Sequence, residues 1–366
     1  MIYNSFKKCA ISNLGLGYMR HENNSAELVD YAIANGVNYF EACTFYLNGN
    51  CESVVRKSLE KYPRERYNIC DKLSVLGTNF ETLDLEQFFN EQLEKCGVDY
   101  FDVYLLQALD RNCFDILAKY PIIEFFNKKR EEGKIINFGF SFHDTVDILT
   151  QFLEMNNWDC VQIQLNYYDW YLGSAKALYW KLVEVNMPII VMGPCKGGTL
   201  TDKLPLHIQR MYESAFGGQK LFTLAHNFLR NLSGVKVVLT GAHTLDQVQQ
   251  VVDFYNKAPE PLKMQDKLSM QAILDEYCKF NTIACTGCGY CQTVCPQQID
   301  IKNLFWYYNN IITNTDRERN AEEYYKILKS PHSFFECRHC GQCERICPQH
   351  LKIQNIFNEK LFPMRL

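Results

Sequence analysis

Two cysteine runs near the end of this 366-residue chain restrict its fold and chemistry more than any other feature. Each run has the spacing C-x2-C-x2-C-x3-C-P, over residues 285–296 and 337–348. Structural zinc sites more often use separated C-x2-C pairs, and disulfides are typical of secreted chains. Residues 1–8 contain no apolar signal segment. The spacing therefore predicts iron–sulfur clusters in a reducing compartment, in preference to zinc or disulfides.

The two runs resemble the cluster-binding segments of two-cluster bacterial ferredoxins. In that arrangement three cysteines of one run bind one [4Fe-4S] cluster, and the fourth cysteine binds the other cluster. The resemblance implies two clusters and a capacity for one-electron chemistry. The implied ligand sets are Cys285, Cys288, Cys291 and Cys347 for one cluster, and Cys337, Cys340, Cys343 and Cys295 for the second.

Composition narrows the choice of partners. The net charge is −4 and the pI is near 6.1, which gives no electrostatic reason to expect nucleic acid or an anionic membrane as a partner. No segment approaches the roughly 18 consecutive apolar residues of a membrane-spanning helix. We therefore expect a soluble, cytoplasmic protein. Nine of the 17 cysteines lie outside the two runs, and we interpret them as small buried apolar residues.

From residue 11 to about 257, short apolar runs alternate with longer amphipathic stretches. Eight such pairs predict an α/β fold, a (β/α)8 TIM barrel, because strands covered on both faces have continuous apolar sequences. An open doubly wound sheet would need a Gly-x-Gly-x-x-Gly turn after its first strand, and the sequence has none there. The predicted strands are Asn13–Tyr18, Asn38–Ala42, Tyr67–Leu73, Phe101–Gln107, Ile135–Phe142, Cys160–Asn166, Pro188–Pro194 and Val235–Gly241.

Two prolines in the segment 258–261 predict where the barrel ends. Inside the barrel, Ile116–Glu132 is predicted to be one helix, and the weakly patterned segment Thr199–Gly218 is predicted to be a long loop. The predicted parts are residues 1–257 for the barrel, 258–280 for a linker helix, and 281–366 for a small, α-helical, ferredoxin-like domain with two [4Fe-4S] clusters.

Functional groups of a barrel lie at the carboxyl ends of its strands and in the loops that follow. The segments that cover those positions resemble motifs of the aldo/keto reductase family. The chain as a whole resembles the branch of that family with a C-terminal ferredoxin-like extension. The matching segments are residues 36–42, 67–73, 99–107, 133–144, 161–167 and 191–198.

The resemblance implies a catalytic tetrad of Asp, Tyr, Lys and His in an NADP(H)-dependent carbonyl reductase. Tyr46 matches the proton donor, and Lys72 matches the residue that lowers the tyrosine pKa. Glu41 stands where the family has aspartate, and it keeps the charge that pairs with the lysine. Gln107 stands where the family has histidine; its amide can donate a hydrogen bond to a carbonyl oxygen but cannot titrate.

The same resemblance implies cofactor contacts. Ser141 and Gln162 match residues that bind the nicotinamide amide, and Gly197 with Gly198 matches a close approach to the pyrophosphate. A further segment, which includes Gly241 and His243, matches the site for adenine and the 2′-phosphate.

That segment departs from the family pattern. His243 stands where Arg, Lys or Ser is common, and Val251 stands where the family has Asn. A neutral histidine binds phosphate less well than a guanidinium does. Gly193 also replaces a glutamate that is usual in its loop.

Two functions remain open at this stage. The first is an NADP(H)-dependent reductase that acts on a small-molecule carbonyl substrate, with clusters that exchange electrons with a redox partner protein. The second is a catalytically degenerate barrel that serves as a scaffold or binding module for a ferredoxin-type electron-transfer domain. The sequence leaves open the substrate, the direction of the reaction and a flavin as further cofactor.

Overall fold

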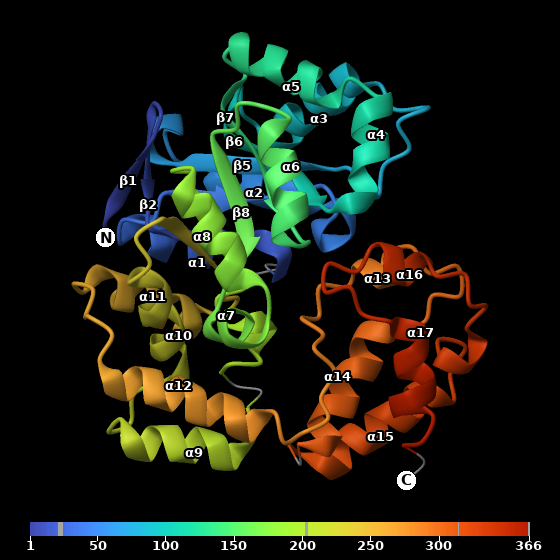
Figure 1. The fold of residues 1–366 in the computed structure, drawn as a ribbon. Helices are drawn as coiled ribbons and strands as arrows, with labels where there is room; N and C mark the ends of the chain where they lie inside the picture. The colour runs from blue at the N-terminus through green and yellow to red at the C-terminus, as the bar shows by residue number, and fades with distance from the viewer. Residues whose placement is uncertain (21–24, 202–203, 314, 365–366) are drawn as a thin grey trace. The chain divides into compact units, whose positions relative to one another are not determined.

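The computed structural model describes residues 1–20, 25–201, 204–313 and 315–364. Eight parallel strands in this part of the chain close into a barrel in the order β10-β3-β4-β5-β6-β7-β8-β9 (Figure 1). The predicted (β/α)8 TIM barrel is thus confirmed. The barrel strands are β3 (Leu14–Gly17), β4 (Tyr39–Glu41), β5 (Asn68–Ser74), β6 (Phe101–Leu109), β7 (Ile135–Phe142), β8 (Cys160–Gln164), β9 (Ile189–Met192) and β10 (Val235–Thr240).

An antiparallel hairpin precedes the barrel and was not predicted from the sequence. Its strands are β1 (Tyr3–Phe6) and β2 (Cys9–Ser12). Phe6 and Ile11 are buried in one apolar cluster with interior side chains of the barrel strands, among them Tyr39 at the start of β4. The hairpin therefore closes the amino-terminal end of the barrel, and the carboxyl ends of the strands are left for function.

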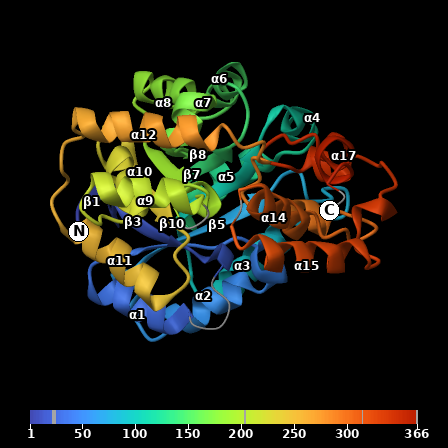
Figure 2. The same cartoon turned by 90° about the horizontal axis from the view of Figure 1, so that it is seen from below.

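Helices connect the strands and cover the outside of the barrel. Local capping explains where several of them begin and end: Asp84 accepts backbone hydrogen bonds at the start of α3, and Gly97, with φ of 69°, ends it. Figure 2 shows α1, α2 and α3 side by side along the strands. The helices of this part are α1 (Ser25–Ala34), α2 (Cys51–Leu59), α3 (Leu85–Cys96), α4 (Phe114–Lys119), α5 (Ile122–Glu131), α6 (Val146–Glu154), α7 (Tyr167–Leu172), α8 (Ala175–Glu184), α10 (Leu221–Arg230) and α11 (Leu245–Asn256).

Two local predictions are wrong. The single helix expected over Ile116–Glu132 is two helices, α4 and α5. Tyr120 has an extended backbone between them, because helical backbone is disfavoured at the position before a proline, here Pro121. The loop expected over Thr199–Gly218 contains the helix α9 (Leu206–Ala215). Buried Ile208 and Tyr212 lie one turn apart on α9, a short apolar face that the weak pattern concealed.

The chain divides into two compact units. Unit 1 comprises Met1–Pro194 and His226–Pro261, and unit 2 comprises Cys195–Ala225 and Leu262–Leu366. Unit 2 therefore includes a segment that the sequence pattern had placed in the barrel domain. The reason is packing, because α9 lies against α12 within unit 2 (Figures 1 and 2).

The apolar core of unit 2 is built mainly from α14 and the last turns of the chain, and it contains Leu304, Phe305, Ile353 and Phe357. This small core lies around the cysteine runs and fixes their backbone. The helices of unit 2 besides α9 are α12 (Met264–Tyr277), α13 (Tyr290–Thr293), α14 (Ile301–Ile312), α15 (Arg317–Leu328), α16 (Gln342–Arg345) and α17 (Ile353–Ile356).

The close packing of β7 against β8 can be tested at Gly139. A Cβ atom at this position would collide with the carbonyl oxygen and the Sγ atom of Cys160, and both belong to the buried sheet. We expect Gly139→Ala to lower the free energy of unfolding by about 1–3 kcal/mol, measured by urea denaturation of the whole protein.

Gly17→Ala is the matched control for this variant. Among the residues that the structure describes, a Cβ atom at Gly17 would meet the carbonyl oxygen of Thr240, at 3.7 Å, an ordinary van der Waals distance. The packing argument fails if the two variants lose the same stability.

Candidate functional site in the barrel and cluster pockets in the second unit

The barrel strands direct alternate side chains into the barrel. Tyr39, Cys70 and Val103 belong to the apolar cluster in the barrel interior. Side chains in the same phase, but nearer the carboxyl ends, are Glu41 on β4, Lys72 on β5 and Gln107 on β6, together with Ser141 on β7 and Gln162 on β8. Strand alternation thus gives five of the predicted barrel residues the inward-facing phase of their strands.

Glu41, Lys72 and Tyr46 form a buried chain of polar contacts. The Lys72 Nζ atom donates a hydrogen bond to Glu41 Oε1 and forms an ion pair with it. The same Nζ atom donates to the Tyr46 hydroxyl at 3.2 Å and lies 4.9 Å from the centre of the tyrosine ring. The Lys72 side chain is only 1% exposed, so these contacts replace its hydration.

The charge state of Lys72 depends on its partner. Burial is the largest single effect and lowers the pKa of Lys72, but the Glu41 carboxylate, through its charge and its hydrogen bond, and the nearby Cys43 and Cys70 together raise it, and the net pKa lies above the ordinary lysine value. Lys72 is therefore an ammonium group at neutral pH. An ammonium beside a tyrosine hydroxyl stabilises the tyrosinate, which makes the hydroxyl a better proton donor.

The turn that carries Tyr46 is strained. Tyr46 begins the short helix η2 (Tyr46–Gly49), and Leu47 and Asn48 adopt left-handed φ angles of 52° and 54°. Such backbone is uncommon for residues other than glycine, and it occurs often at functional sites. The turn begins with a hydrogen bond from the Tyr46 amide to the carbonyl oxygen of Cys43, at 2.9 Å.

A second polar network supports this site from the outside of the barrel, and no pattern in the sequence indicated it. Gln92 of α3 donates from Nε2 to the Thr44 hydroxyl, to Asp71 Oδ2 and to the Lys72 carbonyl oxygen, at 3.0, 3.1 and 3.1 Å. The Thr44 hydroxyl in turn donates to Glu52 at 2.7 Å. Gln92 therefore joins the end of β5 to the segment that precedes Tyr46.

Gln107 lies beside an irregularity in β6. The register of β6 with β7 shifts between Leu106 and Leu109, and Ala108 has a left-handed φ of 56°. The Ala108 amide donates to the Ser141 hydroxyl oxygen at 2.8 Å, which holds this bulge. The Gln107 Oε1 atom accepts a hydrogen bond from the buried Cys43 thiol at 3.1 Å. A bulge next to a site re-aims a side chain, and here that side chain is Gln107.

Ser141 and Gln162, predicted to bind nicotinamide, are both buried. The Gln162 Nε2 atom contacts the sulfur of Met192 at 3.5 Å. Within the described ranges of the chain, Gln162 Oε1 is buried without a hydrogen-bond partner. A buried amide oxygen of this kind suits a ligand that supplies an N–H donor, such as a carboxamide.

The segment after β10 contains Gly241 and His243, which are exposed. Val251 is buried on α11, so its side chain belongs to the core of unit 1. A residue that sequence reasoning missed lies close by: a Cβ atom on Gly241 would be 3.0 Å from Arg20 Nη1. The missing side chain of Gly241 leaves room for a guanidinium, the group best suited to bind phosphate.

Gly197 and Gly198, predicted to approach the pyrophosphate, belong to unit 2. Gly197 has a φ of 65°, and a Cβ atom there would collide with the carbonyl oxygen of Thr286 in the first cysteine run. Packing within unit 2 is therefore a sufficient reason for glycine at position 197.

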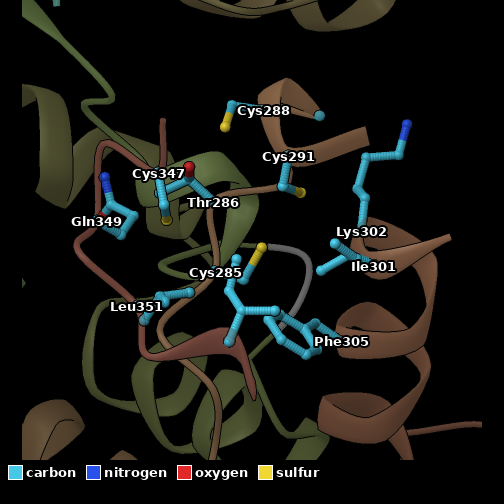
Figure 3. A pocket seen from close by; sticks show the side chains of 12 residues that line it. Cys285, Thr286, Cys288, Cys291, Ile301, Lys302, Phe305, Cys347, Gln349 and Leu351 are labelled. Atoms are coloured by element: carbon cyan, nitrogen blue, oxygen red, sulfur yellow. The ribbon is translucent and has the colours of Figure 1, made fainter. Parts of the chain in front are cut away.

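The first three cysteines of one run and the last cysteine of the other surround each of two pockets in unit 2. Figure 3 shows one pocket, in which the four side chains border a common space. The empty volumes of the two pockets are about 350 and about 340 Å³. The cysteines are Cys285, Cys288, Cys291 and Cys347 around the first pocket, and Cys295, Cys337, Cys340 and Cys343 around the second.

The surroundings of the pockets suit iron–sulfur clusters. Ile301 lines both pockets, so they share a wall. Burial raises the pKa of Cys288 to about 11 and that of Cys343 to about 12, so these thiols become thiolates only when a metal displaces their protons. Backbone amides also point at sulfur atoms, from Gly287 to Cys285 and from His339 to Cys337, each at 3.4 Å. Such donors tune cluster potentials.

Comparisons with known proteins identify a barrel family and a cluster-binding domain in this chain. The sequence profile of the Aldo/keto reductase family matches residues 13–268, which is more than half of the chain. The chain belongs to this family. A second profile, that of the 4Fe-4S dicluster domain, matches residues 284–351. The protein is therefore an aldo/keto reductase-like oxidoreductase with a ferredoxin-like domain of the type that carries two 4Fe-4S clusters.

Solved structures of aldo/keto reductases share the barrel fold. AKR11C1 from Bacillus halodurans, in its holo form, is 20% identical; the match covers 75% of this chain and 96% of that one, with a TM-score of 0.62. An aldo-keto reductase from Klebsiella pneumoniae in complex with NADPH is 16% identical over 75% and 96% of the two chains, with a TM-score of 0.58. At these identities the likeness concerns the fold.

Curated relatives match separate parts of this chain. The probable aldo-keto reductase 1 of Glycine max is 25% identical over 150 residues, which are 36% of this chain and 41% of that protein. A component of the ion-translocating oxidoreductase complex of Buchnera aphidicola (subsp. Acyrthosiphon pisum, strain APS) is 30% identical over 73 residues, which are 20% and 13% of the two chains. The chain spans less than half the length of either relative. None of the helices that the structure describes is long and apolar enough to cross a membrane.

The buried ion pair yields a stability prediction. Glu41→Gln removes the counter-charge of Lys72 and leaves a buried cation, so we expect a loss of about 3–5 kcal/mol of unfolding free energy near pH 7. The folded-state pKa of Lys72 is raised, so the pair contributes fully below the ordinary lysine pKa of about 10.4 and less at higher pH. Urea denaturation should thus show the parent and the variant converging as the pH rises.

Glu41→Asp is the control, because it keeps the charge and shortens the side chain by one methylene. We expect this variant to retain most of the stability lost in Glu41→Gln. Equal losses in the two variants near pH 7 would show that shape rather than charge makes position 41 important.

Proposed function

We propose that the barrel is an NADP(H)-dependent carbonyl reductase in which Tyr46 is the proton donor. The observation that carries this proposal is the buried chain from Glu41 through Lys72 to the Tyr46 hydroxyl. A charged lysine is costly to bury, and a purely structural barrel interior would use apolar residues at this place. The cost is understandable if the ammonium lowers the pKa of a catalytic hydroxyl.

In this reaction NADPH, when bound, supplies the hydride that adds to the carbonyl carbon. The Tyr46 hydroxyl donates its proton to the carbonyl oxygen as negative charge develops there. Lys72 stabilises the tyrosinate that remains, and Glu41 keeps Lys72 charged. The amide of Gln107 donates a hydrogen bond to the same carbonyl oxygen, which orients the substrate without taking part in proton transfer.

The described residues fit a dinucleotide. The orphaned Gln162 Oε1 atom can accept a hydrogen bond from the nicotinamide carboxamide, and the Ser141 hydroxyl lies on the neighbouring strand. The Arg20 guanidinium beside Gly241 supplies a cation for phosphate, which compensates for the histidine at position 243. The NADPH in the related structure from Klebsiella pneumoniae is consistent with this assignment.

We assign the two cysteine sets as the cluster ligands, with one crossed cysteine in each set. The clusters would carry single electrons between the protein and a redox partner. Their pockets share the wall formed by Ile301, so electrons could pass from one cluster to the other inside unit 2.

A second function is favoured by one observation. Gln107 occupies the histidine position of the family and cannot titrate. A barrel without a proton-transferring residue there could serve as a scaffold for the electron-transfer domain. The retained Lys72 and Tyr46 contacts favour the reductase.

The reductase proposal predicts the kinetics of a Tyr46→Phe variant. NADPH should bind the anaerobically purified protein, and the fluorescence of the cofactor should change on binding. In the variant, binding should persist, while NADPH oxidation with small aldehydes or ketones should slow by about a hundredfold or more, since a positioned general acid contributes that much.

Tyr31→Phe is the control, because the Tyr31 hydroxyl bonds Asp253 at an exposed position of unit 1. It should leave the rate unchanged. Failure to bind millimolar NADPH would reject the reductase and support the scaffold, and an undiminished rate in Tyr46→Phe would remove the assigned proton donor.

The crossed ligand sets predict which cysteine variants alter the same cluster signal. Electron paramagnetic resonance of the reduced protein should show that Cys347→Ser and Cys285→Ser lose or alter the same cluster signal. Cys295→Ser and Cys337→Ser should alter the other signal. Iron content should fall from about eight atoms per chain in each case.

Cys278→Ser is the control, because Cys278 is exposed and lines neither pocket. It should keep both signals. If Cys347→Ser instead alters the signal that depends on Cys337, each run binds its own cluster and the crossed assignment is wrong.

A further inference from the structure

Cys43 lies at a junction of the site that the proposed function does not use. It follows Glu41 by two residues, is fully buried, and accepts the amide hydrogen bond that begins the Tyr46 turn. Its Sγ atom lies 3.1 Å from Gln107 Oε1. Cys43 thus contacts the Tyr46 turn through its backbone carbonyl, and it contacts the Gln107 amide through its side chain.

A glutamine at this position must present one particular end of its side-chain amide to the substrate. Its terminal amide has an acceptor oxygen at one end and a donor nitrogen at the other, and the two ends have nearly the same shape. Only the nitrogen can donate to a substrate carbonyl oxygen. The opposite orientation would place Oε1 against that oxygen, which is repulsive. A neighbour that donates to Oε1 favours the productive orientation.

The Cys43 thiol is suited to this selection. Burial raises the pKa of Cys43 to about 12, so the sulfur carries its proton at neutral pH and can donate. An S–H group is a weak donor that pairs with the amide oxygen, whereas the NH2 end could bond the sulfur only as a weak acceptor. The same burial makes Cys43 unsuited to act as a nucleophile or redox-sensing thiolate.

We propose that Cys43 is a positioning residue that orients the Gln107 amide: its S–H donates to Oε1 and directs the Nε2 hydrogens away from Cys43, toward the substrate carbonyl oxygen. This inference rests on the proposed reductase function for its kinetic consequence. The orientation itself is a property of the protein alone. The bulge at Ala108 fixes where Gln107 leaves β6, and Cys43 fixes how its amide is turned.

The kinetic test compares three variants. Cys43→Ala removes the donor, and we expect kcat/KM for a carbonyl substrate to fall by about tenfold, with kcat falling more than KM rises, because the lost contact develops with the charge on oxygen. Cys43→Ser restores an O–H donor and should return kcat/KM to within about threefold of the parent. NADPH affinity should be unchanged in both variants.

Cys160→Ala is the matched control for cavity formation. Cys160 is equally buried and belongs to the apolar cluster in the barrel interior, so its truncation should lower the unfolding temperature as much as Cys43→Ala without reducing kcat/KM. A double variant, Cys43→Ala with Gln107→Ala, should be no slower than Gln107→Ala alone, because the thiol acts only through the glutamine.

A spectroscopic test does not depend on activity. The Raman S–H stretching band of Cys43, obtained as the difference between the parent and Cys43→Ala, should lie at the lower frequency of a hydrogen-bonded thiol. It should shift to higher frequency in Gln107→Ala. An unshifted band would overturn the orientation, whether or not the protein reduces carbonyls.

The two tests separate the two proposals. A shifted band in a protein that binds no NADPH would retain the Cys43 contact and reject the reductase. Reductase activity that is unaffected by Cys43→Ala would retain the reductase and overturn the role of Cys43. Loss of rate in Cys43→Ala without rescue by Cys43→Ser would also overturn that role, because it would indicate a packing effect.

Discussion

The ion pair between Lys72 and Glu41 is the interaction on which the proposed chemistry of the barrel depends. An ammonium inside a barrel is strongly disfavoured unless a carboxylate offsets the loss of water. Because Glu41 supplies that carboxylate, Lys72 stays charged and can donate to the Tyr46 hydroxyl. Glutamate in place of the family's aspartate preserves this contact, since the longer side chain still reaches Lys72 Nζ.

Strand alternation explains why the site is where it is. The residues that close the amino-terminal end of the barrel are apolar and include Phe6 and Ile11 of the hairpin. The same phase of the strands, continued to the carboxyl ends, places Glu41, Lys72 and Gln107 in the interior. The bulge at Ala108 interrupts this alternation directly after Gln107, the residue that stands where the family resemblance implies histidine. The amide oxygen of Gln107 accepts a hydrogen bond from the neighbouring Cys43 thiol.

Unit 2 is subject to a different constraint, because a small apolar core must position two groups of four cysteines. The runs provide short local spacing, and the fold brings the last cysteine of each run to the pocket of the other. Ile301 stands between the two pockets and keeps their walls apolar. The inclusion of the segment 195–225 in this unit means that Gly197 packs against the first cysteine run.

The sequence by itself determined the parts of this protein that depend on local pattern. Eight apolar runs predicted the barrel to within a few residues per strand, and the cysteine spacing predicted the clusters. Only the tertiary structure decided which distant side chains meet. Gln92 is separated in sequence from Thr44 by 48 residues, and Cys43 is separated from Gln107 by 64. Arg20 and Gly241 lie close together although they are near opposite ends of the barrel sequence. A single sequence carries no periodic signal for such pairs, since their contact follows from barrel closure and from the irregular backbone at the strand ends.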